Sequence, residues 1–160
     1  MIKAGDRIPE GTFTRMTDKG PAPLSTLEVF GSKKVVFFAV PGAFTPTCSK
    51  QHLPGYVANA DAIKAKGVDT IACVAVNDVF VMDAWGKAQH VGDKVLMLAD
   101  GNAEFTKKLG LELDATKSGM GTRSRRFSMV VEDGVVKELN VESPGEFKVS
   151  SAESTCRLSA

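Results

Sequence analysis

The sequence predicts an α/β domain in which a mixed β-sheet is flanked by helices. Runs rich in Val, Ile and Phe alternate along the chain with segments of helical spacing. Near the C-terminus, two apolar runs flank an Asp-Gly pair, which is typical of a hairpin turn. Strands that alternate with helices, followed by a hairpin and a last helix, indicate an α/β sandwich whose strand order the sequence leaves open.

Five segments are expected to be strands because β-branched and aromatic residues dominate them: 34–40, 70–76, 95–98, 127–131 and 135–141. Four segments are expected to be helices: 53–63, 80–89, 103–109 and 151–158. Gly67 follows the first of these helices and Gly110 is a plausible C-cap of the third. No repeat or low-complexity tract divides the chain, so we expect residues 1–160 to form a single domain.

Composition excludes several classes of protein. The 160 residues include 20 Lys and Arg against 19 Asp and Glu, a net charge of +1 that gives no nucleic-acid signature. No apolar run approaches the roughly 20 residues that span a bilayer. Charged residues occupy the N-terminus where a secretory signal would be apolar, so we expect a soluble, cytoplasmic protein without membrane or nucleic-acid partners.

The chain contains three cysteines, Cys48, Cys73 and Cys156, at wide and unequal spacing. This pattern argues against a disulfide framework and against a zinc ribbon. The chain has only two histidines, His52 and His90, and no closely spaced cysteine pair. We therefore expect no metal site, and each thiol has to be considered individually.

The segment 41–48, PGAFTPTC, joins the first buried strand to the first long helix and is the most informative part of the chain. Thr45 suits the N-cap and Pro46 the first helical position, which places Cys48 in the first turn. Unpaired backbone N–H groups and the helix dipole favour a thiolate there, so we expect a nucleophile and not a structural, buried cysteine. Pro54, inside the helical pattern, is expected to kink the first turns.

A thiolate needs a compensating positive charge, and Arg123, Arg125 and Arg126 lie just before a predicted strand. One of them could face the thiolate, but the three could equally form a solvated surface cluster. Spacing does not choose among them.

The segment PGAFTPTCSKQHLPGY resembles the active-site segment of the peroxiredoxins, P-x-x-x-T-x-x-C, and specifically that of the peroxiredoxin 5 (type II) subgroup. Residues 76–82, 84–86, 126–131 and 133–134 agree with the same family, so the resemblance covers nearly the whole chain. It implies a thioredoxin-like fold and a thiol peroxidase of antioxidant defence, which reduces hydrogen peroxide and alkyl hydroperoxides without a metal or flavin cofactor. Gln51 stands three residues after Cys48, so the C-x-x-C of thioredoxin itself is absent.

The resemblance also implies a role for four residues. Cys48 matches the peroxidatic cysteine, which becomes a sulfenic acid. Thr45 matches the hydroxyl that hydrogen-bonds the thiolate and the peroxide, Pro41 the residue that shields the thiolate from water, and Arg126 the guanidinium. The resemblance further implies a homodimer packed near the active-site loops.

Two catalytic cycles remain open. Cys73, in the predicted strand 70–76, matches a second cysteine of type II members but is expected to be structural. Cys156 does not match the resolving cysteine of animal peroxiredoxin 5. We therefore favour a one-cysteine cycle, in which glutathione with glutaredoxin, or thioredoxin, reduces Cys48, over a two-cysteine cycle through Cys73 or Cys156.

A different class of function is a redox-sensing binding or relay module with slow turnover, which sustained consumption of peroxide would distinguish from an enzyme. Among other residues, His52 is expected to serve local packing or hydrogen bonding. The aromatic residues Tyr56, Phe80 and Trp85 are expected in the core or an interface, and Phe44 at the mouth of the site.

Overall fold

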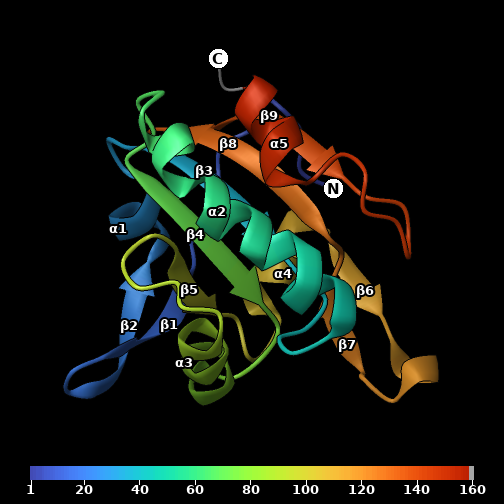
Figure 1. The fold of residues 1–160 in the computed structure, drawn as a ribbon. Coiled ribbons are helices and arrows are strands. Elements are labelled where there is room, and N and C mark those ends of the chain that lie inside the picture. Colours follow the sequence, from blue (N-terminus) through green and yellow to red (C-terminus); the bar gives the residue numbers. More distant parts are fainter. Residues whose placement is uncertain (159–160) are drawn as a thin grey trace.

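A seven-stranded sheet with the order β2-β1-β5-β4-β3-β8-β9 forms the centre of the molecule (Figure 1). This computed structural model describes residues 1–158, and their side chains as far as residue 155. The strands parallel to their neighbours are β3, β4 and β5, and the remaining pairs are antiparallel, which confirms the mixed sheet. The sheet contains β1 (Thr12–Thr17), β2 (Gly20–Ser25), β3 (Lys34–Ala39), β4 (Thr70–Ala75), β5 (Leu96–Ala99), β8 (Phe127–Glu132) and β9 (Val135–Val141).

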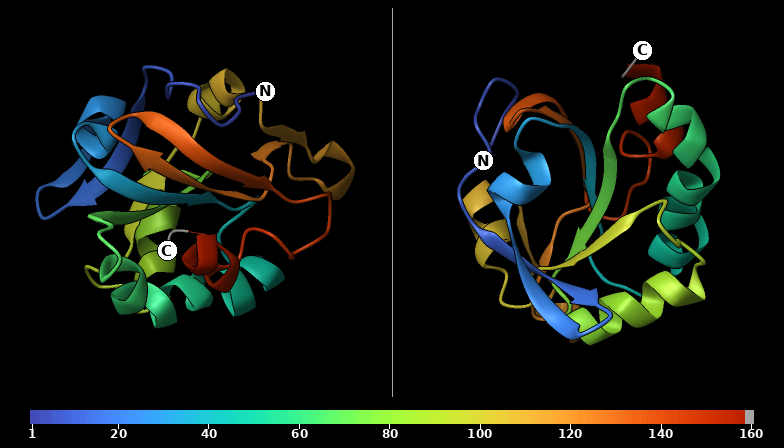
Figure 2. Two further views of the ribbon diagram at one scale, coloured as in Figure 1. Left: turned by 90° about the horizontal axis from the view of Figure 1, so that it is seen from above. Right: turned by 90° about the vertical axis from the view of Figure 1, so that its left-hand side faces the viewer.

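Helices cover both faces of this sheet (Figure 2). One face carries α2 (Leu53–Lys64), α3 (Val79–Ala88) and α5 (Ala152–Leu158), and the other carries α1 (Thr26–Phe30) and α4 (Glu104–Leu109). A small second sheet pairs β6 (Glu112–Asp114) with β7 (Thr122–Ser124), and a 3-10 turn, Thr116–Ser118, lies between them. None of the helices in the described part of the chain has the length and apolar character that crossing a membrane requires.

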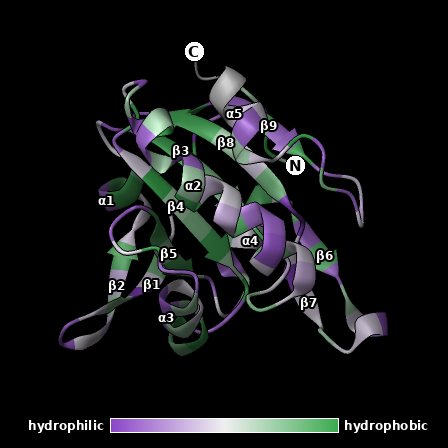
Figure 3. Ribbon diagram, viewed as in Figure 1, coloured by the Kyte–Doolittle hydropathy of each residue, from purple (hydrophilic) through white to green (hydrophobic). Residues whose placement is uncertain are grey.

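The two faces of β3 belong to two different cores. Val36 and Phe38 face α2, α3 and α5, whereas Val35 and Phe37 face α1 and α4. Strands β3, β4 and β8 are buried on both faces and are strongly hydrophobic in Figure 3, as expected for central strands. The predicted strands and helices are confirmed, with ends that differ by at most one residue.

The N-terminal hairpin of β1 and β2, helix α1 and the β6/β7 pair were not predicted from the sequence. Strand β2 contains Pro21 and Pro23, which usually argue against a strand because proline has no N–H to donate to the ladder. The structure accommodates both because β2 is an edge strand, paired only with β1.

The topology brings two distant segments together. Strand β8 runs antiparallel to β3, and Ala39 at the end of β3 pairs with Phe127 at the start of β8. The residues that follow β3 therefore lie beside those that precede β8. These two segments contain Cys48 and Arg126.

Candidate active site

The helix that carries Cys48 begins in the loop after β3, as predicted. Pro46 and Thr47 are already helical, and the backbone N–H of Ser49 donates to the Thr45 carbonyl at 2.9 Å. Cys48 therefore lies in the first turn, where a helix leaves backbone N–H groups without intrahelical partners. The Thr45 side chain departs from the predicted N-cap, because its hydroxyl donates to the Gly42 carbonyl at 2.7 Å.

Residues Cys48–His52 form a π-turn that continues into α2. Pro54 has no N–H to offer the Lys50 carbonyl, and the N–H of Leu53 instead reaches back five residues to the Cys48 carbonyl. The disturbance expected from Pro54 thus takes the form of a widened turn. Its first residue is Cys48.

The Cys48 side chain is fully buried, and a guanidinium contacts its sulfur. Arg126 Nη2 donates to Cys48 Sγ at 3.1 Å. Arg126 reaches the sulfur because alternate residues of β8 face α2. Val130 belongs to the same core cluster as Cys48, and Arg126, four residues earlier, faces the same side of the sheet.

The other two arginines of the cluster bind elsewhere. Arg123 donates to the carbonyls of Met120 and Val76, at 2.9 and 3.1 Å. Arg125 donates to the Glu142 carbonyl at 3.3 Å. The geometry therefore distinguishes Arg126 where sequence spacing did not.

His52 also belongs to this arrangement, in a more specific place than the local packing or hydrogen bonding expected for it. Its ring is fully buried; Arg126 Nη1 lies 2.8 Å from Nδ1, and Nε2 lies 3.0 Å from the Ser150 carbonyl. A guanidinium only donates and a carbonyl only accepts, so Nε2 carries the proton and Nδ1 accepts. Burial, and then the charge of Arg126, lower the pKa of His52 to about 3, which keeps the ring neutral at pH 7.

The sequence does contain a signal for His52. It stands four residues after Cys48, a spacing that places two side chains on the same face of a helix.

A small pocket of about 110 Å³ opens beside the site. Pro41 and Arg126 line it, so a ligand in this pocket would meet the guanidinium that contacts the sulfur, although Cys48 itself does not line it. The rest of its wall consists of Thr47, Leu113, Arg125 and residues 142–146. A larger cavity of about 570 Å³, between α3, β1 and β5, contains none of the four predicted site residues.

Cys73 lies on β4 and is fully buried. Burial, and then the neighbouring Cys48, raise the pKa of the Cys73 thiol well above its usual value. Cys48 and Cys73 are both free thiols. The side chain of Cys156, the third cysteine, lies outside the described residues. Among the side chains that are described, no group of three His, Cys, Asp or Glu is arranged to hold a metal ion.

Comparison with known proteins identifies the family. The redoxin family profile matches residues 3–155. Peroxiredoxin-2E, chloroplastic, from Arabidopsis thaliana is 49% identical over 157 residues, covering 95% of this chain and 67% of the relative. Peroxiredoxin-2B from the same plant is 48% identical over 153 residues, with coverage of 95% and 94%.

Solved structures agree with this result. Reduced Prx3 from Vibrio vulnificus in complex with hydrogen peroxide has a TM-score of 0.96 and 54% identity, with both chains covered completely. Peroxiredoxin 5 from Alvinella pompejana has a TM-score of 0.84 and 37% identity, with coverage of 99% and 97%. The chain therefore belongs to the redoxin family, as a type II peroxiredoxin with a thioredoxin-like fold, and it is a thiol-dependent peroxidase with Cys48 as its peroxidatic cysteine.

Proposed function

We propose that the Cys48 thiolate attacks one oxygen of hydrogen peroxide or an alkyl hydroperoxide, with Arg126, Thr45 and Pro41 completing the active site. The S–O bond forms as the O–O bond breaks, and the departing oxygen takes a proton and leaves as water or an alcohol. The product at Cys48 is a sulfenic acid.

The observation that carries this proposal is the 3.1 Å contact from Arg126 Nη2 to Cys48 Sγ at the start of a helix. The guanidinium is a positively charged group that only donates hydrogen bonds, and it donates to the thiolate. Negative charge moves from sulfur to the departing oxygen during the reaction, and a donor already fixed in place stabilises that charge without reorganisation.

Thr45 and Pro41 have complementary parts in this proposal. The Thr45 hydroxyl donates its proton to Gly42, so its lone pairs are available to accept a hydrogen bond from the O–H of the peroxide. Pro41 lines the small pocket with apolar atoms and has no N–H, so it limits the access of water to the site.

Recycling proceeds through a one-cysteine cycle in this proposal. Glutathione attacks the sulfenic acid, water leaves, and glutaredoxin or a second thiol reduces the mixed disulfide; thioredoxin is the other candidate reductant. The burial and the raised pKa of Cys73 support this choice, because both disfavour the thiolate that resolution requires.

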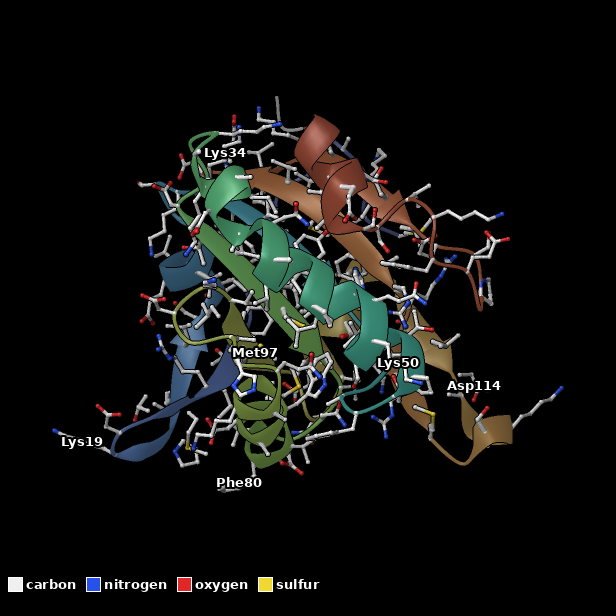
Figure 4. The ribbon with its side chains drawn as sticks, in the orientation of Figure 1. Lys19, Lys34, Lys50, Phe80, Met97 and Asp114 are labelled. Atoms are coloured by element: carbon white, nitrogen blue, oxygen red, sulfur yellow. The ribbon has the colours of Figure 1, made fainter. Side chains whose placement is uncertain are left out.

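A homodimer in the cytoplasm completes the proposal. Phe44 is 56% exposed and Phe80 is 64% exposed, and Phe80 projects from α3 into solvent in Figure 4. The loop that carries Phe44 is linked to the loop that precedes α3, since the Ala43 N–H donates to Asn77 Oδ1 at 2.9 Å. Exposed aromatic residues beside a functional site favour a protein interface, and we assign this surface to a second copy of the chain.

Steady-state consumption of hydrogen peroxide with glutathione and glutaredoxin tests the cycle. We expect Cys48→Ser to abolish turnover, whereas Cys73→Ser and Cys156→Ser retain it. Loss of turnover in either of the last two variants would refute the one-cysteine cycle. A wild-type protein that reacts once and does not turn over with either reductant would instead favour the redox-sensing module.

A further inference from the structure

Glu142, directly after β9, places a carboxylate in the interior. The residue is only 3% exposed. Its oxygens accept hydrogen bonds from the backbone N–H groups of Lys148, Val149 and Ser150 and from the Ser150 hydroxyl, at 2.7 to 2.9 Å. Burial acts to raise the pKa of Glu142, but these hydrogen bonds outweigh it and the pKa lies below its usual value.

The carboxylate has no salt bridge among the described residues, so backbone amides supply its stabilisation. Burying a charge is costly unless it is fully hydrogen-bonded. The three consecutive backbone N–H groups of residues 148–150 all donate to this one carboxylate. The consequence is a fixed position for the backbone of residues 148–150.

The backbone of residues 148–150 contacts the active site through the carbonyl oxygen of Ser150. The Ser150 carbonyl accepts from His52 Nε2 at 3.0 Å and from the Tyr56 hydroxyl at 2.8 Å. The N–H of the same residue donates to Glu142, so the carboxylate orients the carbonyl that determines the His52 tautomer. His52 then presents the lone pair of Nδ1 to Arg126, which contacts Cys48 with its other terminal nitrogen.

We propose that Glu142 is a positioning residue for peroxide reduction, acting through the Ser150 carbonyl and His52 to orient Arg126 on the Cys48 sulfur. The inference rests on the role proposed above for Arg126. It assigns Glu142 no contact with the peroxide.

A second contact from the same segment supports the assignment. The Phe147 ring lies 5.9 Å from the Arg126 guanidinium carbon and 5.0 Å, between ring centroids, from His52. Residues 142–150 thus hold the His52 and Arg126 pair both by a carbonyl and by an aromatic ring. Loss of the Glu142 hydrogen bonds therefore weakens the contacts of both the Ser150 carbonyl and the Phe147 ring with this pair.

The test compares Glu142→Gln with Glu10→Gln, which removes an exposed carboxylate that does not line the pocket beside the active site. The readout is the second-order rate constant for oxidation of Cys48 by hydrogen peroxide in stopped flow. We expect Glu142→Gln to lower it about tenfold, the scale of coupling between residues of one hydrogen-bond network. Glu10→Gln, a surface change, should stay within about twofold of wild type.

A double-mutant cycle separates positioning from a general loss of stability. If Glu142 acts through His52, Glu142→Gln should have no further effect on the rate constant in a His52→Asn background. Independent, multiplicative losses would overturn the proposal, as would an unchanged rate in Glu142→Gln alone. The ¹⁵N shifts of the His52 ring provide a second readout: the single Nε2–H tautomer of wild type should become a mixture of tautomers in Glu142→Gln.

If Glu142→Gln does not fold by circular dichroism, Ser150→Ala replaces it, because that variant removes one of the hydrogen bonds and keeps the carbonyl. It should lower the rate constant in the same direction, and an unchanged rate would reject the inference. Arg126→Lys keeps the two proposals apart. If Arg126→Lys lowers the rate constant but the Glu142 and Ser150 variants do not, only the positioning role of Glu142 is refuted. If the rate constant is unchanged in Arg126→Lys, the role proposed for Arg126 is refuted, and the positioning role of Glu142 fails with it.

Discussion

Replacing Arg126 with lysine tests the geometry of the site while conserving its charge. The guanidinium makes two directed contacts, Nη2 to Cys48 Sγ at 3.1 Å and Nη1 to His52 Nδ1 at 2.8 Å. A single ammonium group cannot reproduce this fork, because its donors radiate from one atom. Arg126→Lys therefore loses at least one of these two charge-assisted hydrogen bonds.

The size of the effect follows from that bond. A hydrogen bond to a charged group is worth about 1.5–3 kcal/mol. Each 1.36 kcal/mol changes a rate by about tenfold, so we expect Arg126→Lys to react with hydrogen peroxide about 10- to 100-fold more slowly. Replacement by alanine removes the charge as well, and its loss should reach the hundredfold or greater range of a missing oxyanion donor.

Stopped-flow fluorescence measures this directly. Trp85 is the single tryptophan, and its indole N–H donates to the hydroxyl of Ser49, the neighbour of Cys48, at 3.0 Å. Arg123→Lys is the matched control, because Arg123 binds backbone carbonyls and does not contact the sulfur. An Arg126→Lys rate within twofold of the control would refute the account of the guanidinium.

Three further predictions concern His52, the π-turn and the exposed aromatic residues. The His52 pKa of about 3 lies below its ordinary 6.5, so the unfolded state binds the proton first; the His52 contribution to stability is complete above pH 6.5 and is lost as pH falls towards 3. As the pH is lowered between these limits, the thermal unfolding midpoint should decrease less steeply in His52→Asn than in wild type or in the control His90→Asn. Equal slopes in all three proteins would contradict a buried, neutral His52 ring. Pro54→Ala restores the missing N–H and should convert the π-turn towards an α-helix, lowering the peroxide rate constant about tenfold by displacing Cys48 while thermal stability is kept or raised; an unchanged rate would show that the widened turn does not matter. Phe80→Asp should shift the dimer towards monomer in sedimentation velocity, relative to Leu27→Asp on another exposed apolar residue, and an unaltered dimer would exclude this surface as the interface.

The sequence predicted the central elements because their residues leave few alternatives. Strands β3, β4 and β8 consist of apolar runs that only a buried sheet accommodates. The missed elements carry weaker patterns. Strand β2, Gly-Pro-Ala-Pro-Leu-Ser, has two prolines that only an edge position tolerates, and a single strand does not show whether it lies at an edge.

Helix α1 was missed although its signal is present. It has only five residues, too few for apolar periodicity to appear. The Ser25 hydroxyl accepts from the Glu28 N–H, and the Glu28 carboxylate accepts from the Ser25 N–H, which is the capping box that Ser-x-x-Glu encodes. The capping pair, and not apolar periodicity, marks this helix in the sequence.

In the candidate site, too, some residues could be predicted from local sequence and others could not. The position of Cys48 depends on neighbouring residues, because Thr45 and Pro46 mark the helix start locally. The choice of Arg126 and the relay through His52 depend on the pairing of β8 with β3 and on a carbonyl about a hundred residues along the chain. Local patterns do not contain such long-range pairings, and the family resemblance supplied Arg126 but left His52 without a specific role.

The most direct test of the central claim is a single-turnover reaction of the pre-reduced protein with one equivalent of hydrogen peroxide, followed by Trp85 fluorescence and ended by intact and peptide mass spectrometry. We expect rapid, stoichiometric oxidation that adds one oxygen at Cys48 and is absent in Cys48→Ser. A loss of two hydrogens would instead indicate a disulfide and a two-cysteine cycle. Oxidation that is no faster than that of a free thiolate, or that persists in Cys48→Ser, would contradict a preorganised peroxidatic site at Cys48.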